Sequence, residues 1–368
     1  MDGERIIIHC DMDAFFAAVE TLHHDLDPEV PLILGSDPQN GRGRGIVSTC
    51  NYAARKYGIH SAMAISEAWR RCPGAPIGEG MYMRSTRGLY RRASRKVMEI
   101  LATEADRFEK ASVDEAYLDI TSKVDGDWDS ALALARELQS RILQRLGLSS
   151  SFGIGPTRIV AKMSSEENKP AGIHMVRSGE VMNFFADRPT REVPGISPSS
   201  ANRLAEWGIE TMDEAYAMGE LALARVTSER FAKWAIRVVE GETSNQVSPL
   251  RSRKSIGKEY TFDKDQTDMQ IVIEKLAILI DKVVDRMRGM GISARVAEVK
   301  IRYAGFETHT NHRSIPVAMD EGEIFHRLAR RLFAQNCDFD RPVRLIGFRV
   351  GGLEMPDTKQ TTLDWEEE

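Results

Sequence analysis

The sequence predicts an α+β protein with several domains. Its 368 residues are 42% hydrophobic, which allows a sizeable core but is long for a single one. Short apolar strands alternate with helical patterns up to about residue 167, a helical segment follows from about residue 176, and a second strand–helix–strand–strand–helix–strand pattern spans residues 255–353. These observations predict a ferredoxin-like sheet, a small helical domain and a further α/β domain.

The composition narrows the class of protein. No apolar run approaches the roughly 20 residues of a membrane span, and the acids at the N-terminus are unlike a signal peptide. The four cysteines are scattered without CxxC spacing, so we expect a reduced, intracellular protein without structural zinc. We also expect a cytoplasmic location and a monomer. The net charge of −5 argues against a uniformly basic surface but allows a local basic stripe that binds nucleic acid.

Six short strands are predicted in the first half of the chain. Residues 5–13, 30–35 and 45–50 are apolar and bounded by Pro, Gly or acids, which favours strands. A helix is expected over 82–104, followed by two strands (106–112 and 115–121), a leucine-rich helix over 128–147, a strand over 149–155 and a helix that begins at Pro156. The helix over 82–104 is basic, and its cations suit either a solvated face or contacts to nucleic acid: Arg84, Arg87, Arg91, Arg92, Arg95 and Lys96.

The helical segment begins with a turn-and-cap signature. Gly195 suits a turn, Ser197 a helix cap and Pro198 the first helical position. This pattern predicts a helix-hairpin-helix, whose turn amides can hold a backbone phosphate, although a generic helical hairpin is the alternative. Residues 241–254 are polar, contain a proline and end in basic residues, so we expect an interdomain linker there.

The stretch KASVDEAYLDIT, residues 110–121, contains two adjacent acids in a strand pattern. A bend at Asp114 and Glu115 would free both from strict alternation, and the strand over 5–13 would bring Asp11 and Asp13 beside them. Clustered carboxylates repel one another unless a cation neutralises them, and oxygen ligands suit Mg²⁺ or Mn²⁺. Two such ions could support phosphoryl transfer. Taken alone, an Asp–Glu pair is more often a surface turn.

Four ordered motifs carry a resemblance to a known family. DMDAFFAAVE, STCNYAARKYGI, ASVDEAYLDIT and SFGIGPTRIVAKMSSEENKPAGI occur in the order and at the spacing of Y-family DNA polymerases. The sequence resembles the DinB type most closely, from about residue 5 to 350. The resemblance implies a right-hand polymerase with a ferredoxin-like palm, small fingers, a helix-hairpin-helix thumb and an α/β little finger.

The domain boundaries follow from this resemblance. The palm would be residues 1–13 and 81–175, the fingers 14–80 and the thumb 176–240. The linker would be 241–254, the little finger 255–353 and the C-terminal tail 354–368. Expected DNA contacts lie in the thumb turn, after the linker and on the last strand: Gly195, Ile196, Arg253, Lys254, Arg344 and Arg349. Arg158 and Lys162 are further candidates.

The resemblance also implies the catalytic residues. Asp11, Asp114 and Glu115 would be the catalytic acids and would ligate two Mg²⁺ ions, with help from the main-chain oxygen of Met12; Mn²⁺ can substitute. Asp13 would be a structural hydrogen-bonding residue.

The same motifs imply the nucleotide-binding residues. Expected dNTP contacts are Phe15, Phe16, Thr49, Tyr52, Arg55 and Lys169. Phe16 would be the steric gate that excludes a 2′-hydroxyl, since its ring would pack under the sugar. Taken alone, Phe16 would be an ordinary core residue, and Tyr52 and Arg55 would belong to a capped surface helix.

The implied activity is template-directed, low-fidelity translesion synthesis without proofreading. The primer 3′-hydroxyl would attack the α-phosphate of a dNTP, and pyrophosphate would leave. A palm-type nucleotide cyclase and a non-catalytic DNA-binding scaffold are the alternatives, and only the scaffold would lack metal-dependent turnover.

Some positions depart from the family pattern. Cys10, Ala14 and Glu166 differ from its commonest residues, and the small Ala14 leaves the degree of ribose discrimination open. In the tail, Gln360, Leu363 and Trp365 resemble a peptide that binds a sliding clamp, with a disordered acidic tail as the alternative.

Overall fold

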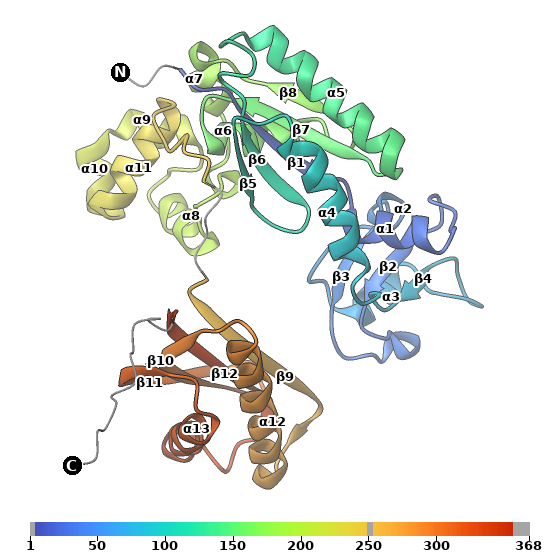
Figure 1. The fold of residues 1–368 in the computed structure, drawn as a ribbon, viewed down its shortest axis with the longest axis vertical. Helices are drawn as coiled ribbons and strands as arrows, with labels where there is room; N and C mark the ends of the chain where they lie inside the picture. Colours follow the sequence, from blue (N-terminus) through green and yellow to red (C-terminus); the bar gives the residue numbers. More distant parts are fainter. Residues whose placement is uncertain (1–3, 249–252, 356–368) are drawn as a thin grey trace, which may run out of the picture. The chain divides into compact units, whose positions relative to one another are not determined.

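The structure, a computed structural model, describes residues 4–248 and 253–355 (Figure 1). The chain divides into two compact units, Met1–Leu250 and Arg251–Glu368. Within the described residues, no helix is long and apolar enough to cross a membrane.

The first unit is built on a five-stranded central sheet with the order β5-β6-β1-β7-β8. Its strands are β1 (Ile7–Met12), β5 (Arg107–Lys110), β6 (Glu115–Asp119), β7 (Ser150–Gly155) and β8 (Ile173–Met175). β1 lies at the centre, antiparallel to β6 and β7, and β8 adds a parallel edge strand to β7. The predicted ferredoxin-like sheet is therefore confirmed, with one extra strand.

The two faces of the central sheet are covered by different helices. On one face, Ile8, Cys10 and Met12 pack in a core with α4 (Leu89–Ala102) and α5 (Trp128–Leu146). On the other face, His9 hydrogen bonds to Ser165 of α6 (Arg158–Glu167). Because side chains alternate along a strand, Asp11 shares the α6 face with His9.

Two predicted helix boundaries are wrong. Met81–Met83 is not helical but forms strand β4, which pairs with β2, and α4 begins only at Leu89, after Gly88 in the left-handed conformation (φ 79°). Arg84 and Arg87 therefore precede the helix. α6 begins at Arg158 rather than Pro156, because the Thr157 side chain caps it by accepting from the Val160 amide.

A small sheet with the order β3-β2-β4 lies within residues 14–83. It contains β2 (Leu32–Gly35), β3 (Val47–Cys50) and β4, and the neighbouring helices are α1 (Phe15–His23), α2 (Tyr52–Arg55) and α3 (Ile65–Arg71). α1 follows β1 directly, so it starts beside the acids of the central sheet.

Residues 181–239 form a helical cluster with its own core. Its helices are α7 (Val181–Phe185), α8 (Pro198–Ala205), α9 (Met212–Met218), α10 (Glu220–Val226) and α11 (Glu229–Val239). Ser197 caps α8 by accepting from the Ser200 amide at 3.1 Å, and Pro198 is the first helical residue. Gly195 has a φ of 107°. These local predictions are confirmed.

The first part of the predicted linker is docked on the central sheet. Val247 is 1% exposed and packs with Ile7, Tyr117 and Ala161. The Arg158 amide donates to the Ser244 carbonyl at 3.2 Å, and the Ser248 amide donates to Glu109 at 3.1 Å. Residues 249–252 lie outside the described residues.

The second unit is one antiparallel sheet with two helices on one face. Its elements are β9 (Ser255–Gln266), α12 (Met269–Arg288), β10 (Ser293–Tyr303), β11 (Thr308–Met319), α13 (Gly322–Asn336) and β12 (Val343–Glu354). The predicted element order is confirmed. The strand order is β11-β10-β12-β9, which places β10 and β12, the second and fourth strands of this unit along the chain, at the centre. In the ferredoxin-like part of the first sheet, the central strands are instead β1 and β6, the first and third along the chain.

Candidate active site

The bend between β5 and β6 is held by Ser112. Its hydroxyl oxygen accepts from the amides of Asp114 (3.1 Å) and Glu115 (3.0 Å). On the other side of the bend, the Met12 amide donates to the Asp114 carbonyl at 3.1 Å, which ties Asp114 to the end of β1. The predicted bend is confirmed. Ser112 was not singled out from the sequence, although a serine before two acids is a common turn signal.

The bend brings the acids of two strands together. Asp11 and Glu115 are directly opposite in the register of β1 and β6. Opposite residues of an antiparallel pair project to the same face with neighbouring Cβ atoms. Asp11 is 8% exposed, whereas Asp114 and Glu115 are half-buried. The site therefore opens from a buried acid toward two more accessible ones.

Two lysines lie among these acids. Lys169 Nζ is 2.9 Å from Asp11 Oδ1 and 2.8 Å from Glu166 Oε1. Lys162 Nζ is 2.6 Å from Glu115 Oε1. Both ammonium groups supply the positive charge that clustered carboxylates need. Sequence reasoning assigned Lys169 to nucleotide binding and did not foresee either ion pair.

The acids of β1 and of the bend offer only oxygen donors to a metal ion. Among residues 4–248 and 253–355, no three His, Cys, Asp or Glu side chains are gathered closely enough to hold one. The oxygen donors on β1 and at the bend fit a hard cation such as Mg²⁺ in their chemistry, since every one of them is a carboxylate or a carbonyl oxygen. The convergence of three carboxylates on one ion stays a prediction.

Burial shifts the protonation of Asp11. It raises the pKa of this carboxyl to about 7, against the opposing effect of the nearby Lys169 ammonium. Burial disfavours the charge on Lys169, but Asp11 and Glu166 outweigh it and raise the pKa of Lys169. Each of these two groups therefore stabilises the charged form of the other.

His9 is a buried polar residue behind Glu115. Its Nδ1 is 2.8 Å from Ser165 Oγ, and its Nε2 is 3.9 Å from Glu115 Oε2. Burial, and then the charge of Lys162, lower the pKa of His9 well below its usual value. Sequence reasoning missed His9, although a histidine directly after three isoleucines in a predicted buried strand was the available signal.

Asp13 has the structural role expected of it. Its carboxylate accepts from Ser149 Oγ (2.5 Å), Ser151 Oγ (2.8 Å) and the Ala171 amide (2.9 Å). Asp13 thus joins the end of β1 to β7 and to the loop that contains Lys169. The expected hydrogen-bonding role is confirmed.

The two phenylalanines that begin α1 have different surroundings. Phe15 is 3% exposed and packs in the core of the central sheet, whereas Phe16 is half-buried. The Phe16 ring packs edge-on against Tyr90. The Tyr90 hydroxyl donates to Glu20, a fully buried carboxylate that also accepts from the Thr86 amide at 2.6 Å. Tyr90 and Glu20 were not predicted from the sequence.

The predicted triphosphate residues lie at the end of β3 and on α2. Thr49 and Tyr52 are half-buried, and Arg55 is exposed with its guanidinium 4.5 Å from the centre of the Tyr52 ring. The Tyr52 hydroxyl is buried without a hydrogen-bond partner among the described residues. Burial raises the pKa of Tyr52, the charge of Asp13 raises it further, and the charges of Arg55 and Lys169 lower it. Tyr52 therefore lies near the acids of β1.

Asn51 fixes the start of α2. It is 8% exposed, and its side-chain oxygen accepts from the amides of Ala54 and Leu32. This asparagine holds α2 against β2 and was missed in the sequence, where an asparagine before a short helical run was its only signal.

The expected DNA-contact residues lie in both units. In the first unit, a Cβ on Gly195 would lie 3.0 Å from Trp234, so the turn packs directly on that ring, and Ile196 is buried. In the second unit, Arg253 and Lys254 are exposed before β9.

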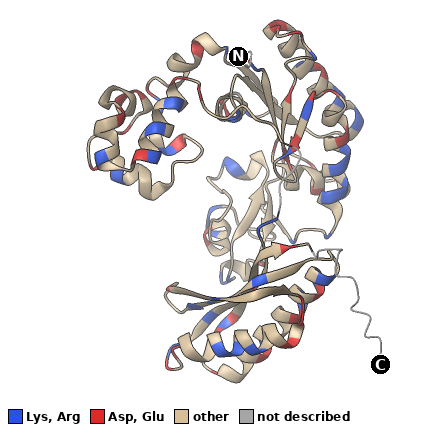
Figure 2. Cartoon of the chain, turned by 60° about the vertical axis from the view of Figure 1, so that its left-hand side comes forward, with Lys and Arg blue, Asp and Glu red and all other residues tan. Residues whose placement is uncertain are grey.

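The last strand carries the other two expected contacts. Arg344 stacks on Phe306 at 4.2 Å, and Arg349 is ion-paired with Glu298 at 2.6 Å. Figure 2 shows basic and acidic residues on both units. The clamp-peptide residues of the tail lie outside the described residues.

Comparison with known proteins agrees with the resemblance to Y-family DNA polymerases. Residues 10–166 match the impB/mucB/samB family, and residues 253–363 match the C-terminal domain of that family. A DNA polymerase IV of Methanoculleus marisnigri is 37% identical over 98% of both chains. A DNA polymerase IV of Streptococcus thermophilus is 35% identical over 99% of this chain and 97% of its own.

Solved structures agree with this result. A Y-family DNA polymerase chimera of Dbh and Dpo4 matches with a TM-score of 0.84 at 27% identity, covering 95% of this chain and 99% of that one. DinB from Sulfolobus solfataricus matches with a TM-score of 0.64 at 26% identity, covering 94% of this chain and 98% of its own. The chain belongs to the Y family of DNA polymerases and is a DinB-type, DNA-directed polymerase of translesion synthesis.

Proposed function

We propose that this polymerase extends a primer by two-metal-ion nucleotidyl transfer, with Asp11, Asp114, Glu115 and the main-chain oxygen of Met12 as the metal ligands. The observation that carries the proposal is the register pairing of Asp11 with Glu115 at the Ser112 bend. Two bound Mg²⁺ ions would activate the primer 3′-hydroxyl and stabilise the charge on the leaving pyrophosphate.

The protein's own residues would bind and orient the substrates. Lys169 reaches Asp11 and could equally neutralise a triphosphate, while Thr49, Tyr52 and Arg55 lie where a strand turns into a helix and offer hydroxyls and a guanidinium. Phe16 would exclude a 2′-hydroxyl. The partially exposed Asp114 and Glu115 leave room for the primer end.

We assign the parts of the fold to the expected polymerase domains. The central sheet would be the palm, residues 14–80 the fingers, the helical cluster the thumb and the second unit the little finger. Similar structures include an insertion ternary complex of Dbh DNA polymerase, which supports primer-template DNA and a dNTP as partners of this chain. We also expect synthesis without proofreading.

The decisive experiment is primer extension with Mg²⁺ on an undamaged and an abasic template. Wild type should extend both, and Asp114→Ala/Glu115→Ala should extend neither. The matched control is Asp320→Ala/Glu321→Ala, which removes another adjacent Asp–Glu pair in the second unit and should retain activity. If wild type binds primer-template but adds no nucleotide, the scaffold alternative replaces the proposal.

The proposal includes a sliding clamp as partner of the tail through Gln360, Leu363 and Trp365. A pull-down with the full chain and with a chain lacking residues 356–368 tests it. Equal clamp binding by both forms would contradict this part alone.

A further inference from the structure

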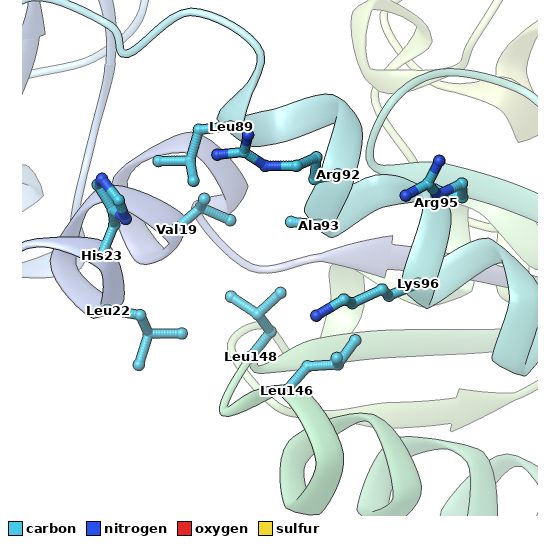
Figure 3. A pocket seen from close by; sticks show the side chains of 10 residues that line it. All are labelled: Val19, Leu22, His23, Leu89, Arg92, Ala93, Arg95, Lys96, Leu146 and Leu148. Carbon is cyan, nitrogen blue, oxygen red and sulfur yellow. The ribbon is translucent and has the colours of Figure 1, made fainter.

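A cavity of about 300 Å³ lies between α1, α4 and the connection from α5 to β7 (Figure 3). Its floor is aliphatic and comes from all three elements: Val19, Leu22, Leu89, Leu146 and Leu148. Leu22 is 51% exposed, and Leu143 on the neighbouring end of α5 is 54% exposed. A partner that covers these leucines would gain from their burial.

The rim of this cavity is basic. His23 contributes from α1, and Arg92, Arg95 and Lys96 contribute from α4. Figure 3 shows Arg92 and Lys96 reaching over the floor from α4. None of the ten lining residues is acidic. An apolar floor under a cationic rim is complementary to apolar side chains flanked by carboxylates.

The position of the cavity separates it from the active site. Leu89 and Leu148 pack in the same core cluster as Cys10 and Met12, whose side chains leave β1 on the face opposite to Asp11. A primer end held at Asp11 therefore lies across the sheet from this cavity. A sugar–phosphate backbone also offers no aliphatic group that would fill the leucine floor. The observations thus favour a peptide over DNA as the occupant.

We propose that this cavity is a docking site for a segment of a partner protein that presents large apolar side chains between Asp or Glu residues. The apolar side chains would occupy the leucine floor, and the carboxylates would pair with Arg92 and Lys96. Because the cavity is behind the central sheet, the partner could stay bound while primer-template occupies the other face.

The test pans a random-peptide phage library against the full-length protein. Enriched peptides should combine Leu, Ile, Phe or Trp with Asp or Glu. Synthetic labelled copies of them should bind wild type in fluorescence polarisation, and saturating primer-template should leave that binding unchanged. Lys96→Glu should weaken binding at least about tenfold, and Leu22→Asp should also weaken it.

The matched control is Arg136→Glu, which reverses an exposed cation on α5 away from the cavity lining and should bind the peptides as wild type does. Three results would overturn the proposal. The first is that panning enriches no peptides of this kind. The second is that wild type and Lys96→Glu bind the peptides equally. The third is that Lys96→Glu loses affinity for primer-template whereas Arg136→Glu does not. The last result would assign the rim to DNA.

Discussion

The ring of Phe16 stands edge-on against the ring of Tyr90, with their centroids 4.5 Å apart and their planes at 67°. The Tyr90 hydroxyl is in turn hydrogen bonded to the buried Glu20. Phe16 on α1 is thus supported by a residue on α4, which would hold its ring in place if a nucleotide sugar packs on it as proposed.

Phe16→Ala should raise the ratio of ribonucleotide to deoxynucleotide incorporation by about tenfold or more, because the ring would no longer clash with a 2′-hydroxyl. Tyr90→Ala should raise it less, and Tyr90→Phe least, since only the hydroxyl is lost. Single-nucleotide insertion with dNTP and rNTP pairs measures this ratio. Unchanged sugar selectivity in Phe16→Ala would mean that another residue guards the 2′ position.

Lys169→Ala should weaken dNTP binding roughly 10- to 100-fold, as expected for a lost charged hydrogen bond. The effect should appear in the KM for dNTP more than in the affinity for primer-template. Lys123→Ala, at a surface ion pair with Glu104, is the control and should change neither. A normal KM in Lys169→Ala would remove this lysine from the triphosphate site.

Asp13→Ala should lower the free energy of unfolding by about 2–4 kcal/mol, because two serine hydroxyls and the Ala171 amide lose a buried carboxylate acceptor. Asp129→Ala, whose side chain is 78% exposed in a surface pair with Arg177, should cost no more than about 1 kcal/mol. Urea denaturation of both variants gives the comparison. Equally small decreases in the free energy of unfolding of the two variants would show that the Asp13 hydrogen bonds contribute little to stability.

The pH dependence of stability should report Asp11. Its folded pKa of about 7 lies above the value of 3.8 for an unburied aspartate, so the folded protein binds more protons at this site between those two values. Without divalent metal, this group therefore makes stability fall as pH rises from about 4 to 7. Asp11→Asn should remove that fall. Urea midpoints in EDTA at pH 5 and pH 7.5 would show it, and an unchanged slope in the variant would contradict the raised pKa.

Arg158→Ala should destabilise the first unit by about 3–5 kcal/mol, because Glu109 is 3% exposed and would be left buried without its guanidinium partner. It should also loosen residues 243–248, since the Arg158 guanidinium donates to the Gln246 carbonyl at 3.0 Å and only the main-chain bond to Ser244 would remain. Limited proteolysis should then cut this segment faster. The double variant Arg158→Met/Glu109→Gln should recover part of the stability, and a stable, protease-resistant Arg158→Ala would refute the argument.

The sequence by itself determined the features that depend on neighbours along the chain. The apolar run in residues 5–13, the alternation in residues 115–121, the bend at Asp114 and the cap at Ser197 follow from strand patterns and local hydrogen bonding, which act over a few residues. The order of the motifs was likewise enough to identify the family.

Only the tertiary structure decided which distant groups satisfy one another. Tyr82 lies in a strand rather than a helix because its backbone pairs with Ile33 of β2. No pattern in the neighbouring sequence predicts that pairing. Lys162 and Lys169 meet Glu115 and Asp11, and Tyr90 meets Glu20, because burying a polar group requires a partner from whichever segment packs against it. Those partners are set by the packing of whole elements, and sequence spacing does not encode them.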